Sequence, residues 1–209
     1  ILVTVDFYTV NDLHGKIVDG DSQPGVDELT TYLKKARQGD DHAIFLSSGD
    51  MWQGSSESNL TSGMLTTEWM NALDFAAMTL GNHEFDWGED AIEDNDAIAQ
   101  FPFLAINIYD RETNTLAEYC EASTVVDLGS IQIGIIGAIG DCYSSISSDK
   151  TEDIFFKVGR ELTELVKEES ESLREGGADY IVYVLHDGYG QSKSNSVTSI
   201  ADSQIRSYY

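Results

Sequence analysis

The stretch Phe75–Asp86 reads FAAMTLGNHEFD and decides how the rest of the chain is interpreted. Its first half is an apolar run that ends at Gly81, which is typical of a buried strand that stops at the rim of a sheet. Four side chains that can bind a metal ion or move a proton then follow: Asn82, His83, Glu84 and Asp86. One helical turn would bring His83 and Asp86 together. The alternative is a plain strand-to-helix turn in which Asn82 only caps the helix.

Length and composition indicate a folded chain of ordinary size. The 209 residues are 41% hydrophobic, which suits one domain, or one and part of another, with a substantial core. No stretch approaches the roughly 18 consecutive apolar residues of a membrane span. Cys120 and Cys142 could form one disulfide or stay as two free thiols, and the sequence leaves both possibilities open.

The net charge is the unusual feature of the composition. Twelve Lys and Arg against 37 Asp and Glu give a formal charge of −25. Such a field repels nucleic acid polymers and anionic membranes, and both are therefore excluded as general partners. It also repels phosphate esters, so phosphate chemistry here would require bound cations. The alternative is that the acidity only serves solubility, as in exported or salt-adapted proteins.

The expected elements alternate as in an α/β protein. Strands are predicted at 2–10, 43–46, 75–80, 103–108 and 179–185, with a hairpin at 124–128 and 131–136 around Gly129-Ser130. Helices are predicted at 26–38, 64–73, 89–100 and 158–174, with loops at 51–63 and 141–153 and a weakly helical end over 191–209. The hairpin favours a layered α/β sandwich with a mixed sheet over a purely parallel sheet.

Polar side chains of metal-ligand type recur where the predicted strands stop. They are Asp12 and His14, Asp50, Asn82 and His83, and His186. Each of these positions alone is weak evidence, because a turn or a structural histidine accounts for it equally well. Three of the four histidines nevertheless fall at strand ends, whereas His42 is expected to be a surface residue.

These residue types favour hard divalent ions. Carboxylate, amide and imidazole groups suit Mn, Mg, Fe or Zn in a mixed oxygen and nitrogen site, and no cysteine falls at these positions. Two ions roughly 3.5–4 Å apart can clamp a phosphate and activate a water molecule. Such a pair requires a bridging carboxylate, and Asp50, alone at its strand end, is the natural candidate.

Several motifs carry a resemblance to a known family. They are Asn11–Gly15 (NDLHG), Ser48–Gly54 (SGDMWQG), Gly81–Gly88 (GNHEFDWG), Phe103–Ile108 (FLAINI) and Val184–His186 (VLH). In order and spacing they resemble the calcineurin-like metallophosphoesterases. Within that superfamily they look most like the branch of 5′-nucleotidases, UDP-sugar hydrolases and 2′,3′-cyclic nucleotide phosphodiesterases. The resemblance implies a four-layer α-β-β-α sandwich with mixed sheets.

The resemblance also implies a site for two divalent metal ions (Mn, Zn, Fe or Mg). Asp12 and His14 would bind the first ion, Asp50 would bridge, and Asn82 and His186 would bind the second. Asn82 would in addition contact the substrate.

Catalytic roles carry over to the central motif. His83, oriented by Asp86, would contact the phosphate and donate a hydrogen bond or proton to the leaving oxygen. A metal-bound hydroxide would attack phosphorus in line. Glu84 needs no catalytic role and is a candidate for holding a ligand in its orientation.

The chain departs from the family pattern at one point. The family completes its site with a later Gly-His-x-His stretch, and no histidine follows His186. We therefore expect residues 1–209 to be an N-terminal catalytic domain that lacks its final ligand motif and the C-terminal substrate-binding domain of the parent chain. Each metal would then lack one protein ligand, and this piece would be weakly active or inactive.

The resulting prediction is a 5′-nucleotidase-like hydrolase of nucleotide catabolism, acting on nucleotides or other phosphate esters. The alternatives are a 2′,3′-cyclic nucleotide phosphodiesterase or UDP-sugar hydrolase, and a non-catalytic module with the same fold that binds a metal or a partner. The acidity, a chain that does not start with Met, and the habits of the family favour an extracytoplasmic location, whether secreted, periplasmic or associated with the cell wall.

Overall fold

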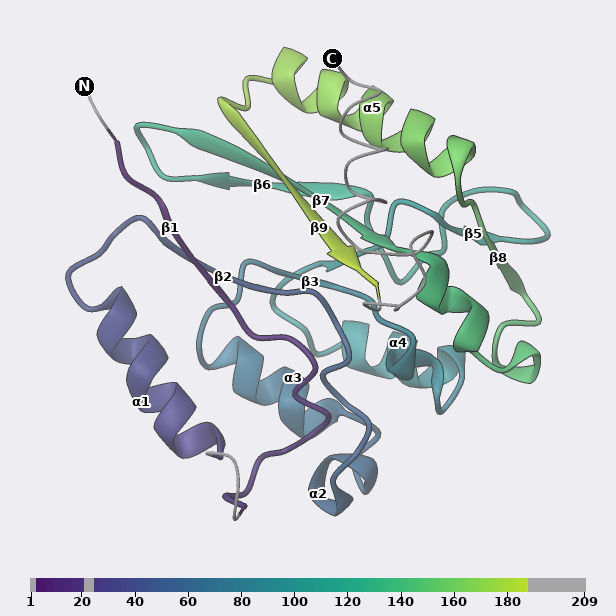
Figure 1. The fold of residues 1–209 in the computed structure, drawn as a ribbon, viewed down its shortest axis with the longest axis horizontal. Coiled ribbons are helices and arrows are strands. Elements are labelled where there is room, and N and C mark those ends of the chain that lie inside the picture. The colour runs from purple at the N-terminus through teal and green to yellow at the C-terminus, as the bar shows by residue number, and fades with distance from the viewer. Residues whose placement is uncertain (1–2, 21–24, 188–209) are drawn as a thin grey trace, which may run out of the picture.

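Four parallel strands form the first sheet of the computed structural model, which describes residues 3–20 and 25–187 (Figure 1). In spatial order they are β1 (Asp6–Thr9), β2 (Ala43–Ser47), β3 (Ala77–Thr79) and β4 (Phe103–Leu104). Because the strands are parallel and consecutive, their carboxyl ends lie at one edge of the sheet. β1, β3 and β4 are shorter than the sequence predicts, whereas β2 runs one residue longer.

The second sheet is mixed. It holds β6 (Ser123–Asp127), β7 (Gln132–Ile139) and β9 (Tyr180–His186) in that order. β6 and β7 form the predicted antiparallel hairpin, and Gly129 in its turn has a φ of 76°, a conformation that glycine adopts without strain. β9 then pairs in parallel with β7. The prediction of a mixed sheet is confirmed.

The predicted strand at 103–108 is wrong as a single element. β4 ends at Leu104, and β5 (Ile108–Asp110) belongs to a separate two-stranded sheet with β8 (Ile154–Phe156). Asn107 lies at the break, fully buried, and its side chain bonds the backbone N–H and carbonyl of Ile139 at 3.1 and 2.8 Å. These tertiary bonds to β7 take the chain out of the first sheet.

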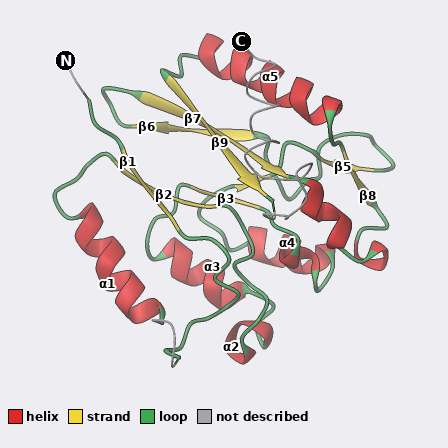
Figure 2. Ribbon diagram, viewed as in Figure 1, coloured by secondary structure: helices red, strands yellow, loops and turns green. Residues whose placement is uncertain are grey.

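The helices cover the two outer faces (Figures 1 and 2). On the first sheet lie α1 (Val26–Arg37), α3 (Met64–Asn71) and α4 (Glu89–Asp96), with α2 (Ser56–Asn59) beside α3, and on the second lies α5 (Arg160–Glu175). α3 and α4 end earlier than predicted. Both predicted loops contain helical turns, namely α2 and the 3₁₀ turns η2 (Asp141–Ser145) and η3 (Ser148–Lys150).

Three hydrophobic clusters fill the spaces between the layers. Ile44 and Leu46 of β2 pack with Ile133 and Ile135 of β7 between the two sheets. Phe45, which points to the opposite face of β2, packs among the helices of the first sheet. A third cluster, with Leu162, Val166 and Leu173 of α5, covers the second sheet. These layers are helix, sheet, sheet and helix, so the predicted four-layer sandwich is confirmed.

Across residues 3–20 and 25–187, no helix combines the length and apolar character that crossing a bilayer requires. The weakly helical segment predicted at 191–209 lies outside the described residues.

Candidate metal centre

The predicted ligands follow the carboxyl ends of the first three strands. Asp12 and His14 come after β1, Asp50 after β2 and Asn82 after β3. His186 is the last residue of β9 and arrives from the second sheet. The site therefore lies where the ends of the two sheets meet.

Asp12, His14 and Asp50 form a compact group in which the potential ligand atoms lie within 4.8 Å of one another. All three residues have a positive φ, at 51°, 50° and 55°. Such a conformation costs a residue other than glycine roughly 1–3 kcal/mol and persists only where the surroundings hold it. Here the N–H of Asp12 bonds the carbonyl of Gly49, and the N–H of His14 bonds that of Asp50, both at 3.0 Å.

Asn82 and His186 join this group through Asp50. His186 Nε2 lies 3.1 Å from Asn82 Oδ1 and 3.4 Å from Asp50 Oδ1. Asp50 is thus in contact with both sets of candidate ligands. The structure brings all five predicted ligands together, with Asp50 in the position that a bridging carboxylate requires. Their roles as ligands stay predictions.

Backbone carbonyls fix how the two candidate imidazole ligands are protonated. His14 Nδ1 lies 2.9 Å from the carbonyl of Gln53, and His186 Nδ1 lies 2.6 Å from that of Ser48. A carbonyl oxygen only accepts, so in each ring Nδ1 carries the proton and Nε2 can serve as the ligand atom. The sequence did not indicate these partners, because any residue offers a carbonyl.

The charges of the buried groups depend on one another. Burial acts to lower the pKa of His186, but the bonds and charges of Asp50 and Cys142 together outweigh burial and raise that pKa. For Asp50, burial acts to raise the pKa, and the bonds from His186 and the His83 N–H lower it below its usual range. Asp50 is therefore an anion, and its charge keeps His186 protonated. A metal ion can replace that proton.

Gly81 leaves room at the centre. A Cβ at this position would lie 2.3 Å from Asp50 Oδ1 and 2.8 Å from the Cε1 of His186. The site offers hard oxygen donors and imidazole Nε2 atoms, and Gly81 places no side chain among them. These features fit a divalent ion. In the sequence, this position was indicated by the glycine that ends the apolar run of the predicted strand.

His83 and Asp86 meet as predicted. The 3₁₀ turn η1 (His83–Phe85) places His83 Nδ1 2.8 Å from Asp86 Oδ2. Burial acts to lower the pKa of His83, but the bond to Asp86 and the nearby Asp50 raise it overall. The His83 ring lies 5.1 Å from that of His14, so this pair borders the candidate ligands. The capping alternative for Asn82 is wrong, because its side chain makes no capping bond to the turn.

Three further residues singled out from the sequence are not among the candidate ligands. His42 is partly exposed at the surface, and its Nδ1 bonds the carbonyl of Thr4 at 3.1 Å. Cys120 and Cys142 do not form a disulfide. Burial raises the pKa of Cys120 to about 12, so its thiol stays protonated at neutral pH.

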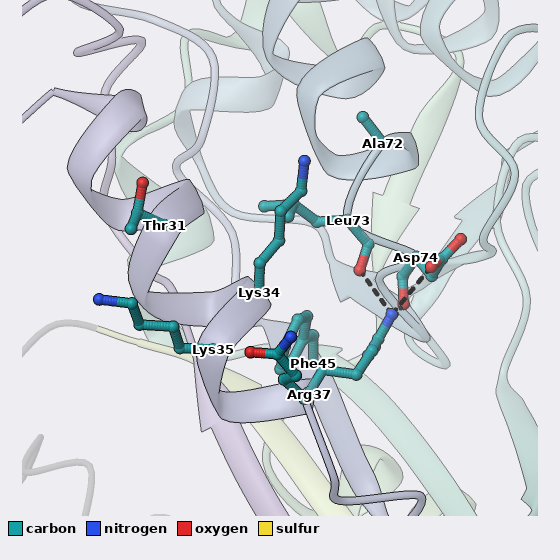
Figure 3. A pocket seen from close by; sticks show the side chains of 9 residues that line it. Thr31, Lys34, Lys35, Arg37, Phe45, Ala72, Leu73 and Asp74 are labelled. Atoms are coloured by element: carbon teal, nitrogen blue, oxygen red, sulfur yellow. Dashed lines mark hydrogen bonds and ion pairs between the residues drawn. The ribbon is translucent and has the colours of Figure 1, made fainter.

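A pocket of about 460 Å³ lies beside α1, away from the candidate ligands (Figure 3). Lys34, Lys35 and Arg37 line it. The Arg37 guanidinium lies 4.1 Å from the centre of the Phe45 ring and bonds Asp74 at 2.9 Å. Asp74 precedes β3, whereas the candidate ligands follow the strands, so this pocket is separate from the candidate metal centre.

Known proteins are similar to this chain over most of its length. The sequence model of the calcineurin-like phosphoesterase family matches residues 6–203. A 5′-nucleotidase of Diplobatis ommata is 28% identical over 195 residues, which is 88% of this chain and 33% of that protein. The 2′,3′-cyclic-nucleotide 2′-phosphodiesterase/3′-nucleotidase of Salmonella typhimurium is 28% identical over 216 residues, covering 91% of this chain and 33% of that protein.

A solved structure shares the fold. The crystal structure of a 5′-nucleotidase precursor from Thermus thermophilus matches with a TM-score of 0.78 and 26% identity, over 90% of this chain and 38% of that one. The chain spans about a third of the length of the curated relatives it matches. Because the family match runs through all the strands and candidate ligands described above, the chain belongs to the calcineurin-like phosphoesterases.

Proposed function

We propose that this chain is the catalytic part of a dinuclear-metal phosphoesterase of the 5′-nucleotidase type that hydrolyses nucleotides. The position of Asp50, in contact with both the Asp12/His14 group and the Asn82/His186 pair, carries this proposal. The similarity to 5′-nucleotidases of other organisms supports the choice of substrate class.

In the proposed site, Asp12 and His14 would hold one ion, Asn82 and His186 would hold the other, and Asp50 would serve both. The donor set suits Mn, Zn, Fe or Mg. Bound ions of this kind polarise phosphoryl oxygens and lower the pKa of water. They also reverse the local sign of a chain whose net charge of −25 would otherwise repel phosphate.

The chain's own residues then act on the substrate. The Nδ1 of His83 is engaged by Asp86 at 2.8 Å, so Nε2 is the atom that donates a hydrogen bond or a proton to the leaving oxygen. The carboxylate of Asp86 keeps the ring in that orientation. The amide nitrogen of Asn82 donates to a phosphate oxygen, since its Oδ1 faces His186.

The second candidate is a 2′,3′-cyclic nucleotide phosphodiesterase, and the similarity to the Salmonella typhimurium enzyme favours it. UDP-sugar hydrolysis belongs to the same class of reaction. We further propose that the chain acts as an N-terminal catalytic domain with a substrate-binding domain of the parent protein, in an extracytoplasmic location.

Hydrolysis of p-nitrophenyl phosphate tests the proposal. We expect activity with added Mn²⁺ and none after chelation with EDTA. Asp50→Asn should abolish that activity, whereas Asp94→Asn, which removes the same charge from an exposed position on α4, should preserve it. A longer parent chain that carries the Gly-His-x-His stretch, holds ions and hydrolyses nothing would contradict the proposal and favour a non-catalytic metal-binding module.

A further inference from the structure

Glu84 is a fully buried carboxylate that the proposed reaction does not use. Its side chain accepts three hydrogen bonds, all from backbone N–H groups. Oε2 accepts from Asp50 at 2.9 Å and from Gly81 at 2.7 Å, and Oε1 accepts from Met51 at 2.8 Å. Among the described residues no Lys or Arg forms a salt bridge with it. Burial and the nearby Asp50 raise the pKa of Glu84, and the backbone N–H donors of Asp50 and Met51 act against that rise.

Two of these bonds act on Asp50 from both sides. The Asp50 N–H belongs to the peptide group before its Cα, and the Met51 N–H belongs to the peptide group after it. One carboxylate that binds both groups restricts φ and ψ of the residue between them. Asp50 is held there with a φ of 55°, a conformation that a residue other than glycine rarely adopts.

The same contacts extend to the other ligand loops. The peptide group that offers the Met51 N–H to Glu84 offers its carbonyl, that of Asp50, to the His14 N–H at 3.0 Å. The bond from Gly81 reaches the residue that precedes Asn82. The Glu84 side chain thus binds the loops after β2 and β3 directly, and it reaches the loop after β1 through the peptide group between Asp50 and Met51.

We propose that Glu84 is a positioning residue, a buried clamp that holds Asp50 in its left-handed conformation and keeps the three ligand loops in register. This inference rests on the proposed function for what the ligands bind, but the clamp itself is a property of the ion-free chain. Glu84 is not itself a ligand, because both of its oxygens are engaged by N–H groups.

Glu84→Gln is the direct test, because glutamine has the same shape but one acceptor oxygen and an NH₂ group that cannot accept. We expect the Mn²⁺ affinity measured by calorimetry to fall about ten- to hundredfold. Glu93→Gln, the same change at an exposed position on α4, should leave the affinity unchanged. Leu162→Ala, which weakens the core beneath α5, should lower the melting temperature without this loss of affinity.

A second measurement needs no metal. Amide hydrogen exchange in the ion-free chain should be slow at Asp50, Met51 and Gly81, and it should become faster at these amides in Glu84→Gln while β7 stays protected. Fast exchange at the three amides in the wild type would overturn the clamp even if the variant failed to fold. Wild-type Mn²⁺ affinity in a folded Glu84→Gln would also overturn it. A wild type that binds no Mn²⁺ but shows the three slow amides would contradict the proposed function and leave the clamp supported.

Discussion

His83 differs from the other two histidines of the site in what holds it. A carboxylate, Asp86, engages its Nδ1, whereas backbone carbonyls engage Nδ1 of His14 and His186. The ring of His83 is about a third exposed, whereas His186 is buried. A histidine paired with a carboxylate at the border of a site is suited to hydrogen bonding or proton transfer toward a substrate.

His83→Ala should therefore slow turnover of a phosphate ester about 10²- to 10⁴-fold, the usual contribution of a general acid or base. The metal content measured by elemental analysis should stay at the wild-type value. His42→Ala is the matched control, because the His42 ring bonds the carbonyl of Thr4 and lies outside the cluster. Loss of ions from His83→Ala would mean that this histidine is a ligand.

Residue identities could be predicted from the sequence, but backbone conformations could not. Asp12, His14, Asp50, Asn82 and His186 stood out because ligand-type side chains followed apolar runs. The positive φ of Asp12, His14 and Asp50 could not be predicted from the sequence. A glycine indicates such a conformation, whereas an aspartate or a histidine usually adopts a negative φ. The backbone carbonyls that bond His14 and His186 could not be predicted either, because every residue offers a carbonyl.

At the scale of elements, the sequence was informative where the hydrophobic pattern was long. The helix α5 is confirmed within two residues of its predicted bounds, because its apolar positions recur over four turns. The break between β4 and β5 was missed because it depends on Asn107 reaching Ile139, 32 residues away. The four-residue helix α2 is too short to show a period, and its signal is the Ser55 cap.

The packing of α5 leads to a prediction about stability. Leu162 is 2% exposed and lies in the cluster between α5 and the second sheet. Leu162→Ala should lower the free energy of unfolding by about 2–5 kcal/mol, because it leaves a cavity in that core. Urea denaturation measures the change.

Leu60→Ala is the matched control for the same substitution at the surface. Leu60 is 87% exposed, so its change should stay within about 0.5 kcal/mol. Equal effects of the two substitutions would mean that α5 does not pack on the sheet as described.

At the scale of the whole molecule, the site depends on the stacking of two sheets. His186 comes from the second sheet and meets Asn82, 104 residues earlier in the chain, at the end of the first. The sequence indicated which side chains were candidates, and only the tertiary arrangement showed that they converge on Asp50. The net charge of −25 attracts cations, and this cluster of carboxylate, amide and imidazole groups can bind them.

Metal stoichiometry tests the central claim most directly. The wild-type chain, Asp50→Asn and Asp94→Asn should each be equilibrated with Mn²⁺, freed of excess ion and analysed for bound manganese. We predict two ions per chain in the wild type and in Asp94→Asn, and loss of both in Asp50→Asn, because Asp50 lies beside both ligand groups. One ion or none in the wild type would contradict a dinuclear site built from residues 1–209 alone, and two ions retained by Asp50→Asn would contradict bridging by this carboxylate.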